Sequence, residues 1–191
     1  MREKGDRYDE RFRRLALSGT DVHGEASFVE SFEPATVLDA GCGSGRVAIE
    51  LARRRIRVTG IDVDPEMLDV AIQKAPRLDW RLGDLASVDI GSEEFDLIVC
   101  AGNVLLFVEL GTEGLVIANL AAHLADGGLL ISGFQLDPRR ITLDSYDEYC
   151  SAQGLELLER WSTWDRQRWE PASSFAVSVH RGHRGHPWAE T

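Results

Sequence analysis

The sequence predicts a doubly wound α/β fold, with a mostly parallel sheet of seven strands, a reversed strand near the C-terminus and helices on both faces. Three observations predict it. Short apolar runs alternate with helical patterns from residue 36 to residue 153. The first run leads into a glycine-rich turn and then a helix. Beyond residue 154, two strand patterns follow each other without a long helix between them, which indicates an antiparallel closing pair.

Composition and charge restrict the class of protein. Asp and Glu number 32 against 21 Lys and Arg, a net charge of −11, so we expect no nucleic-acid partner. No apolar run reaches the roughly 18 residues of a membrane span, and the N-terminus lacks the apolar segment of a signal peptide. The three cysteines show no paired or metal-ligand spacing. We therefore expect one cytoplasmic domain over residues 1–191, without a membrane partner, as a monomer or a homodimer.

Two helices are expected before the first strand, and residues 1–34 form a predicted helical cover. In the first helix, residues 7–18, Tyr8 and Phe12 lie on one apolar face. The second helix spans residues 25–32, and Pro34 ends it.

Residues 35–134 are expected to form a ligand-binding core. The predicted strands span residues 36–39, 57–62, 78–82, 95–100 and 129–134. The predicted helices span residues 45–54, 64–74 and 114–124, and Asp126-Gly127-Gly128 is expected to be a turn. Asp64 is placed to cap the second of these helices, with Pro65 at its first helical position.

Residues 135–181 should contribute a helix and the closing strands, and residues 182–191 a tail. The helix is expected over residues 142–153, and the strands over 155–164 and 175–180. His180, His183 and His186 recur at intervals of three. Because glycines interrupt any helix that would align them, we expect a solvated tail and no metal site. We expect the tryptophans of this part, Trp161, Trp164, Trp169 and Trp188, to pack in the core or at its edge.

Acidic side chains lie at the carboxyl ends of the first three predicted strands. Asp39, Asp62 and Asp84 each stand at a strand end, where open α/β sheets bind ligands. Three clustered carboxylates repel one another, so their arrangement favours a ligand rich in hydroxyl and amino donors. Asp62 follows Gly45 by 17 residues, the place of the acid that binds ribose hydroxyls in dinucleotide sites.

The glycine-rich turn distinguishes between two kinds of ligand. Gly41, Gly43 and Gly45 alternate, and Arg46 takes the sixth place, where a dinucleotide site has glycine. Asp39, just before the turn, would also repel a pyrophosphate. S-adenosylmethionine carries an ammonium and a sulfonium but no phosphate, so it matches this acidic lining better. An NAD(P)-binding oxidoreductase and a non-catalytic S-adenosylmethionine-binding protein stay open as alternatives.

Five segments in order resemble the class I S-adenosylmethionine-dependent methyltransferases. Residues 37–45, 60–68 and 83–85 are similar to the first three motifs of that family, 95–100 to its fourth strand and 124–130 to the entry of its fifth. The resemblance implies a Rossmann-like fold and a methyltransferase. It also implies S-adenosylmethionine as the cofactor and S-adenosylhomocysteine as the product.

The resemblance further implies which residues bind the adenosyl group. Asp62 would bind the ribose hydroxyls, and Val63 would pack on the adenine. Asp84 would accept from the adenine amino group, and the Leu85 amide would face the ring.

The methionine end of the donor is assigned in the same way. Asp39 and the Gly41 carbonyl would hold it, and Gly43 would let the backbone approach. Ala101 and Gly102 would close over it, and Cys42 completes this set.

The acceptor is less defined than the donor. Ala101-Gly102-Asn103-Val104 replaces the Asn/Asp-Pro-Pro-aromatic motif of amino-methylating relatives, which argues against adenine-N6 and glutamine methylation. Because no domain is inserted between the strands, we expect a small-molecule acceptor, with O-, N- or C-methylation open. No catalytic residue is assigned; His23, with a pKa range suited to a general base, is a candidate.

Overall fold

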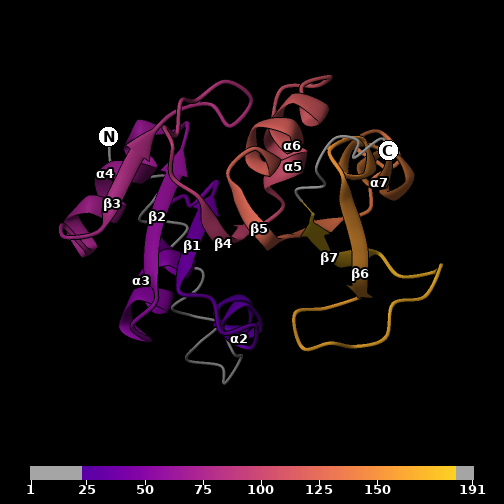
Figure 1. Cartoon of the computed structure of the whole chain (residues 1–191), viewed down its shortest axis with the longest axis horizontal. Helices are drawn as coiled ribbons and strands as arrows, with labels where there is room; N and C mark the ends of the chain where they lie inside the picture. The colour runs from indigo at the N-terminus through magenta and orange to yellow at the C-terminus, as the bar shows by residue number, and fades with distance from the viewer. Residues whose placement is uncertain (1–22, 184–191) are drawn as a thin grey trace, which may run out of the picture.

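A computed structural model describes residues 23–183. In this range the chain forms a seven-stranded sheet of order β3-β2-β1-β4-β5-β7-β6 (Figure 1). The strands are β1 (Thr36–Ala40), β2 (Arg57–Asp62), β3 (Asp79–Leu82), β4 (Phe95–Cys100), β5 (Leu124–Gln135), β6 (Leu155–Trp161) and β7 (Phe175–Gly182). The helices are α2 (Gly24–Glu30), α3 (Arg46–Arg53), α4 (Pro65–Lys74), α5 (Val104–Phe107), α6 (Glu113–Ala121) and α7 (Leu143–Ala152). The helix predicted over residues 7–18 and most of the predicted tail lie outside the described residues.

The strand directions confirm the predicted fold class. β1 runs parallel to β2 and β4, and the pairs β2–β3 and β4–β5 are also parallel. β7 runs antiparallel to both of its neighbours, β5 and β6, so it is the reversed strand. The chain moves outward from β1 to β3 and then returns to β4 on the other side. The switch in strand order therefore lies between β1 and β4, and the carboxyl ends of β1, β2 and β4 meet at one edge.

Two apolar clusters cover the two faces of the sheet. On one face, α2 and α3 pack on strand residues that include Val37 and Val99. On the other face, α6 and α7 pack on residues that include Leu38 and Ile98. Because side chains alternate along a strand, Asp39 shares the α3 face with Val37.

The capping residues act as predicted at α4. The Asp64 carboxylate accepts hydrogen bonds from the amides of Glu66 and Met67, and Pro65 is the first helical residue. These local signals explain why the predicted bounds of β2 and α4 match the structure.

The boundary between α6 and β5 differs from the prediction. The helix expected over residues 114–124 ends at Ala121, and Leu124 already belongs to β5. The expected turn at residues 126–128 lies inside this strand, where Gly127 has a φ of +74°. The register between β4 and β5 shifts at this point, so the glycines form an irregularity within a paired strand rather than a turn.

His180 lies in the predicted closing strand, but the expectation that its side chain is solvated together with His183 and His186 is wrong. This residue lies in β7, between two neighbouring strands, and only 1% of its surface is exposed. Its ring packs edge-on against that of Tyr146, at 5.1 Å between centroids. His183 is exposed and follows the strand, and His186 lies outside the described residues. Trp164 is partly buried and packs edge-on against Phe28, in agreement with the predicted packing at the edge of the core.

Candidate functional site

The loop between β1 and α3 is held against the end of β2. The amides of Gly41 and Cys42 both donate to the carbonyl of Ile61, at 2.8 and 2.9 Å. Gly41, Gly43 and Gly45 have φ values of +78°, +54° and +79°, which L side chains rarely adopt. The backbone conformation of the loop thus requires glycine at these positions.

Neighbouring side chains fill the space where two of these glycines would carry a Cβ. A Cβ on Gly41 would lie 2.5 Å from Cγ2 of Val104, in α5. A Cβ on Gly45 would lie 2.5 Å from Cη2 of Trp80, in β3. The loop is therefore packed between α5 and β3.

Asp62 connects the glycine-rich loop to the start of α4. Its Oδ2 accepts from the Gly43 amide at 2.6 Å, and its Oδ1 accepts from the Asp64 amide at 2.9 Å. Because each carboxylate oxygen can accept a further hydrogen bond, the half-buried side chain keeps acceptor capacity for ligand hydroxyls. The two amides fix its orientation before any ligand arrives.

Asp39 lies on the α3 side of the sheet and is 2% exposed. Its Oδ2 accepts from the Ala48 amide, in the first turns of α3, at 3.0 Å. Burial raises the pKa of Asp39 to about 7, although the Ala48 amide and the Arg46 guanidinium both oppose the rise. A cation bound next to this carboxyl would favour its ionised form.

The third acidic residue lies in an exposed turn after β3. The Asp84 Oδ1 accepts from the Ala86 amide at 2.9 Å, and Leu85 is buried. Val63, after β2, is 66% exposed, so its apolar surface is accessible to a ligand. An apolar ligand surface such as a purine ring would cover it.

The turn after β4 completes this edge of the sheet. Ala101 is buried, and Gly102 and Asn103 have φ values of +70° and +67°. The Asn103 Oδ1 accepts from the Gln135 amide at 2.8 Å and so joins the turn to the end of β5. Phe107, at the end of α5, is 79% exposed.

Thiol chemistry is not favoured at this edge. Burial, reinforced by Asp39, raises the pKa of Cys42, and burial raises that of Cys100 to about 12. Both thiols stay protonated near neutral pH, and a protonated thiol is a poor nucleophile.

Sequence reasoning missed two residues that support the loop. The Lys74 Nζ donates to the Ser44 carbonyl at 3.0 Å. Trp80 lies over Gly60, where a Cβ would come within 2.5 Å of its Cε3, and also against Gly45. The glycine in the middle of β2 was the available signal, since such a glycine often marks a close approach.

The candidate base His23 lies beside the loop rather than within it. It precedes α2, and its Nδ1 is 3.8 Å from Oε2 of Glu50, in α3. This contact gives the ring a structural partner. A role as a base stays a prediction.

An open cavity of about 310 Å³ lies at the opposite edge of the sheet. It is bounded by the starts of β1, β4 and β5, with Pro34, Asp96 and Gly127 among its lining. None of the predicted donor-binding residues lines it, so it is separate from the candidate site. Across residues 23–183, no three His, Cys, Asp or Glu side chains are grouped to hold a metal ion. The same range has no helix long and apolar enough to cross a membrane.

Comparisons with known proteins identify a family. The sequence pattern of the methyltransferase domain family matches residues 37–128. The structure of a TehB-like SAM-dependent methyltransferase from Corynebacterium glutamicum is 35% identical. It superposes with a TM-score of 0.85, over 92% of this chain and 96% of that one.

Curated relatives match over shorter stretches. A magnesium-protoporphyrin O-methyltransferase from Rhodobacter capsulatus is 33% identical over 76 residues, 37% of this chain and 33% of that protein. A dTDP-4-amino-2,3,4,6-tetradeoxy-D-glucose N,N-dimethyltransferase from Saccharopolyspora spinosa is 29% identical over 100 residues, 52% of this chain and 40% of that protein. The chain thus spans well under two thirds of the length of these relatives. The oxidoreductase alternative is not favoured by these matches.

Proposed function

The chain belongs to the S-adenosylmethionine-dependent methyltransferases, and we propose that it transfers the methyl group of this donor to a small-molecule acceptor. The observation that carries the proposal is the Asp62 carboxylate, fixed by the amides of Gly43 and Asp64 at the mouth of the glycine-rich loop. A carboxylate oriented in this way can accept hydrogen bonds from the two adjacent hydroxyls of a ribose.

The adenosyl group would lie along the ends of β2 and β3. Asp62 would accept from the ribose hydroxyls, and the exposed Val63 would cover one face of the adenine. Asp84 would accept a hydrogen bond from the adenine amino group, and the Leu85 amide would face the edge of the ring. The exposure of Val63 supports this placement, since the ligand would remove its apolar surface from water.

The methionine end would lie over the loop and the end of β4. The Gly41 carbonyl and Asp39 would favour its ammonium, and Gly43 would let the backbone come close. Cys42, Ala101 and Gly102 would form the remaining wall. When bound, S-adenosylmethionine supplies a methyl group already activated by its sulfonium. The protein has to hold the acceptor in line with it and exclude water.

A small acceptor is supported by two observations. No domain is inserted between the strands within residues 23–183, so a large polymer would meet no additional binding surface. The two curated relatives described above are named for a porphyrin and a sugar nucleotide, both small molecules. A separate observation bears on the polarity of the acceptor. The exposed Phe107, close after β4, favours an acceptor with an apolar part. The methylated atom, the cytoplasmic location and the oligomeric state stay predictions.

Calorimetry with S-adenosylhomocysteine tests the proposal. We expect the wild type to bind with a micromolar dissociation constant and Asp62→Ala to weaken binding at least tenfold, about 1.4 kcal/mol or more. Asp96→Ala is a matched control, because Asp96 also accepts from two backbone amides, those of Ala35 and Thr36, but at the opposite edge. We expect it to alter stability and leave affinity unchanged.

Other outcomes would decide against the proposal. A wild type that binds neither S-adenosylmethionine nor S-adenosylhomocysteine would contradict it, and enhanced NADH fluorescence on mixing would favour the oxidoreductase. Binding without methylation of a broad panel of small acceptors would favour a non-catalytic role.

A further inference from the structure

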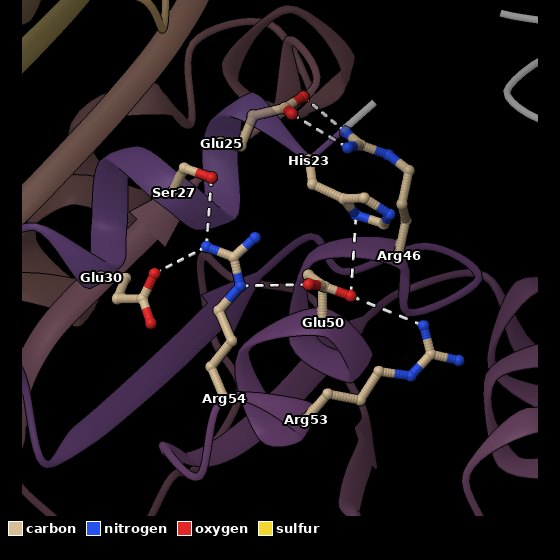
Figure 2. A network of polar contacts seen from close by, with 8 residues as sticks. All are labelled: His23, Glu25, Ser27, Glu30, Arg46, Glu50, Arg53 and Arg54. Carbon is tan, nitrogen blue, oxygen red and sulfur yellow. Dashed lines mark hydrogen bonds and ion pairs between the residues drawn. The ribbon is translucent and has the colours of Figure 1, made fainter. Parts of the chain in front are cut away.

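Ion pairs join α2 to α3 along their lengths (Figure 2). Near the start of both helices, Arg46 donates to both carboxylate oxygens of Glu25, at 2.9 and 2.5 Å. Near their ends, Arg54 pairs with Glu30 of α2 and also with Glu50, one turn earlier in α3. The two helices therefore run side by side in the same direction, with their starts at the ligand edge of the sheet.

The Arg46–Glu25 pair is placed differently from the Arg54 pairs. Arg46 is the first residue of α3 and directly follows Gly45, the last glycine of the loop. The Arg46 and Glu25 side chains are only 13% and 15% exposed, whereas Glu30, the partner of Arg54, is 49% exposed. A two-pronged contact of this kind fixes the orientation of a guanidinium as well as its charge.

Arg46 also acts on the buried carboxyl beneath the loop. Among the charged groups around Asp39, Arg46 from α3 lowers its pKa, whereas Asp62 from β2 and Glu25 from α2 raise it. The Ala48 amide donates to it, and the thiols of Cys42 and Cys100 lie in its electrostatic neighbourhood. Glu25 thus has two opposed effects, because it adds negative charge but holds the cation in place.

We propose that Arg46, oriented by Glu25, is a positioning residue for the methionine end of the methyl donor, acting through Asp39 and the glycine-rich loop. The proposal rests on the proposed function, since it assumes that Asp39 faces the donor's ammonium. Arg46 favours the charged carboxylate that this ammonium needs. Glu25 fixes the guanidinium at the start of α3, two residues before the Ala48 amide that donates to the Asp39 carboxyl. The position of α2 is thereby coupled to donor affinity.

The test is the pH dependence of S-adenosylhomocysteine binding, measured by calorimetry between about pH 5.5 and pH 8. In the wild type, affinity should rise as Asp39 ionises near pH 7. Arg46→Met should weaken binding about tenfold at pH 7 and move this rise to higher pH, because the carboxyl loses its nearby cation. Glu25→Gln should weaken binding less, and should add little in the Arg46→Met background because the two residues act as a unit.

Two further variants separate positioning from folding. Arg54→Met removes the ion pair that joins the far ends of the same two helices, together with the Arg54–Glu50 pair on α3. It should lower the melting temperature but leave the pH profile of binding in place. Arg46→Lys keeps the charge and loses the two-pronged contact, so its pH profile should stay close to that of the wild type with affinity reduced a few-fold.

An Arg46→Met protein that melts earlier but binds with the wild-type pH profile would overturn the inference. So would an Arg54→Met protein whose profile moves equally. Absence of binding by the wild type would instead reject the proposed function itself.

Discussion

Two aspartates at neighbouring strand ends have different environments and therefore different chemistry. Asp62 is half-buried and accepts two backbone amides, and it keeps acceptor capacity for a ligand. Asp39 is fully buried, accepts one amide, and has a pKa raised to about 7 by that burial. The first is suited to neutral hydroxyls, whereas the second becomes a good partner for a cation only when it ionises.

Asp39→Asn should weaken donor binding and raise the stability of the folded protein. A carboxyl pKa raised from 3.8 to about 7 means that the folded state holds the proton more tightly than the unfolded state. The resulting penalty is absent below about pH 4, grows as the pH rises, and is complete above pH 7. An asparagine cannot ionise, and its side-chain oxygen can still accept from the Ala48 amide.

We therefore expect Asp39→Asn to be more stable than the wild type by about 1 to 3 kcal/mol at pH 8, and nearly equal to it at pH 4. Urea denaturation of both proteins at the two pH values measures this difference. Calorimetry should show S-adenosylhomocysteine binding weakened at least tenfold at pH 8. A variant that is less stable than the wild type at pH 8 would contradict this account of Asp39.

At the scale of elements, the glycine-rich loop depends on a strand two positions away in the sheet. Trp80, in β3, lies across Gly60 of β2 and reaches Gly45 at the start of α3. Its indole nitrogen donates to the Ala75 carbonyl at 2.9 Å, which fixes the ring. The position of α3, and with it the loop, is therefore set partly by an aromatic side chain outside the motif.

Gly45→Ala should destabilise the protein by more than its backbone conformation alone requires. The new Cβ would meet both an unfavourable φ of +79° and the Trp80 ring at 2.5 Å. Gly91→Ala is a matched control, since Gly91 has the same φ of +79° but no atom within 4 Å of the Cβ that alanine would add. We expect about 1 kcal/mol of destabilisation at Gly91 and about 2 to 4 kcal/mol at Gly45 from chemical denaturation. Equal losses at the two sites would show that the Trp80 contact is unimportant.

Elements with local signals were predicted well, and those set by pairing were not. β2 and α4 match their predicted bounds because Asp64 and Pro65 mark the helix start within a few residues. The start of β5 was missed because Gly127 and Gly128 look like a turn, while in the folded chain β4 pairs with residues on both sides of them. The burial of His180 depends on β7 lying between two strands, which spacing along the chain does not reveal.

The candidate site likewise contains residues that motif spacing predicted and residues that it did not. The motif spacing predicted that the glycine-rich loop and Asp62 lie together, and the structure connects them through a hydrogen bond from the Gly43 amide. Trp80, Lys74 and the Glu25–Arg46 pair act across 20 or more residues of sequence, so no local pattern predicted their contacts.

At the scale of the whole molecule, the net charge of −11 bears on ligand encounter. S-adenosylmethionine carries a net charge of about +1 at neutral pH, because its ammonium and sulfonium outweigh one carboxylate. S-adenosylhomocysteine lacks the sulfonium and is nearly neutral overall. An acidic protein should attract the first from a distance and have little long-range effect on the second.

This difference predicts how salt affects the two ligands. Raising the ionic strength from about 0.02 M to about 0.5 M shortens the Debye length from roughly 20 Å to roughly 4 Å, so the long-range attraction is largely screened. We expect the association rate constant of S-adenosylmethionine to fall about two- to five-fold over this range, and that of S-adenosylhomocysteine to change little. Stopped-flow tryptophan fluorescence can measure both, since Trp80 lies directly behind the loop. The same salt dependence for both ligands would mean that the acidic field does not steer the donor and that encounter is governed by the local geometry of the site.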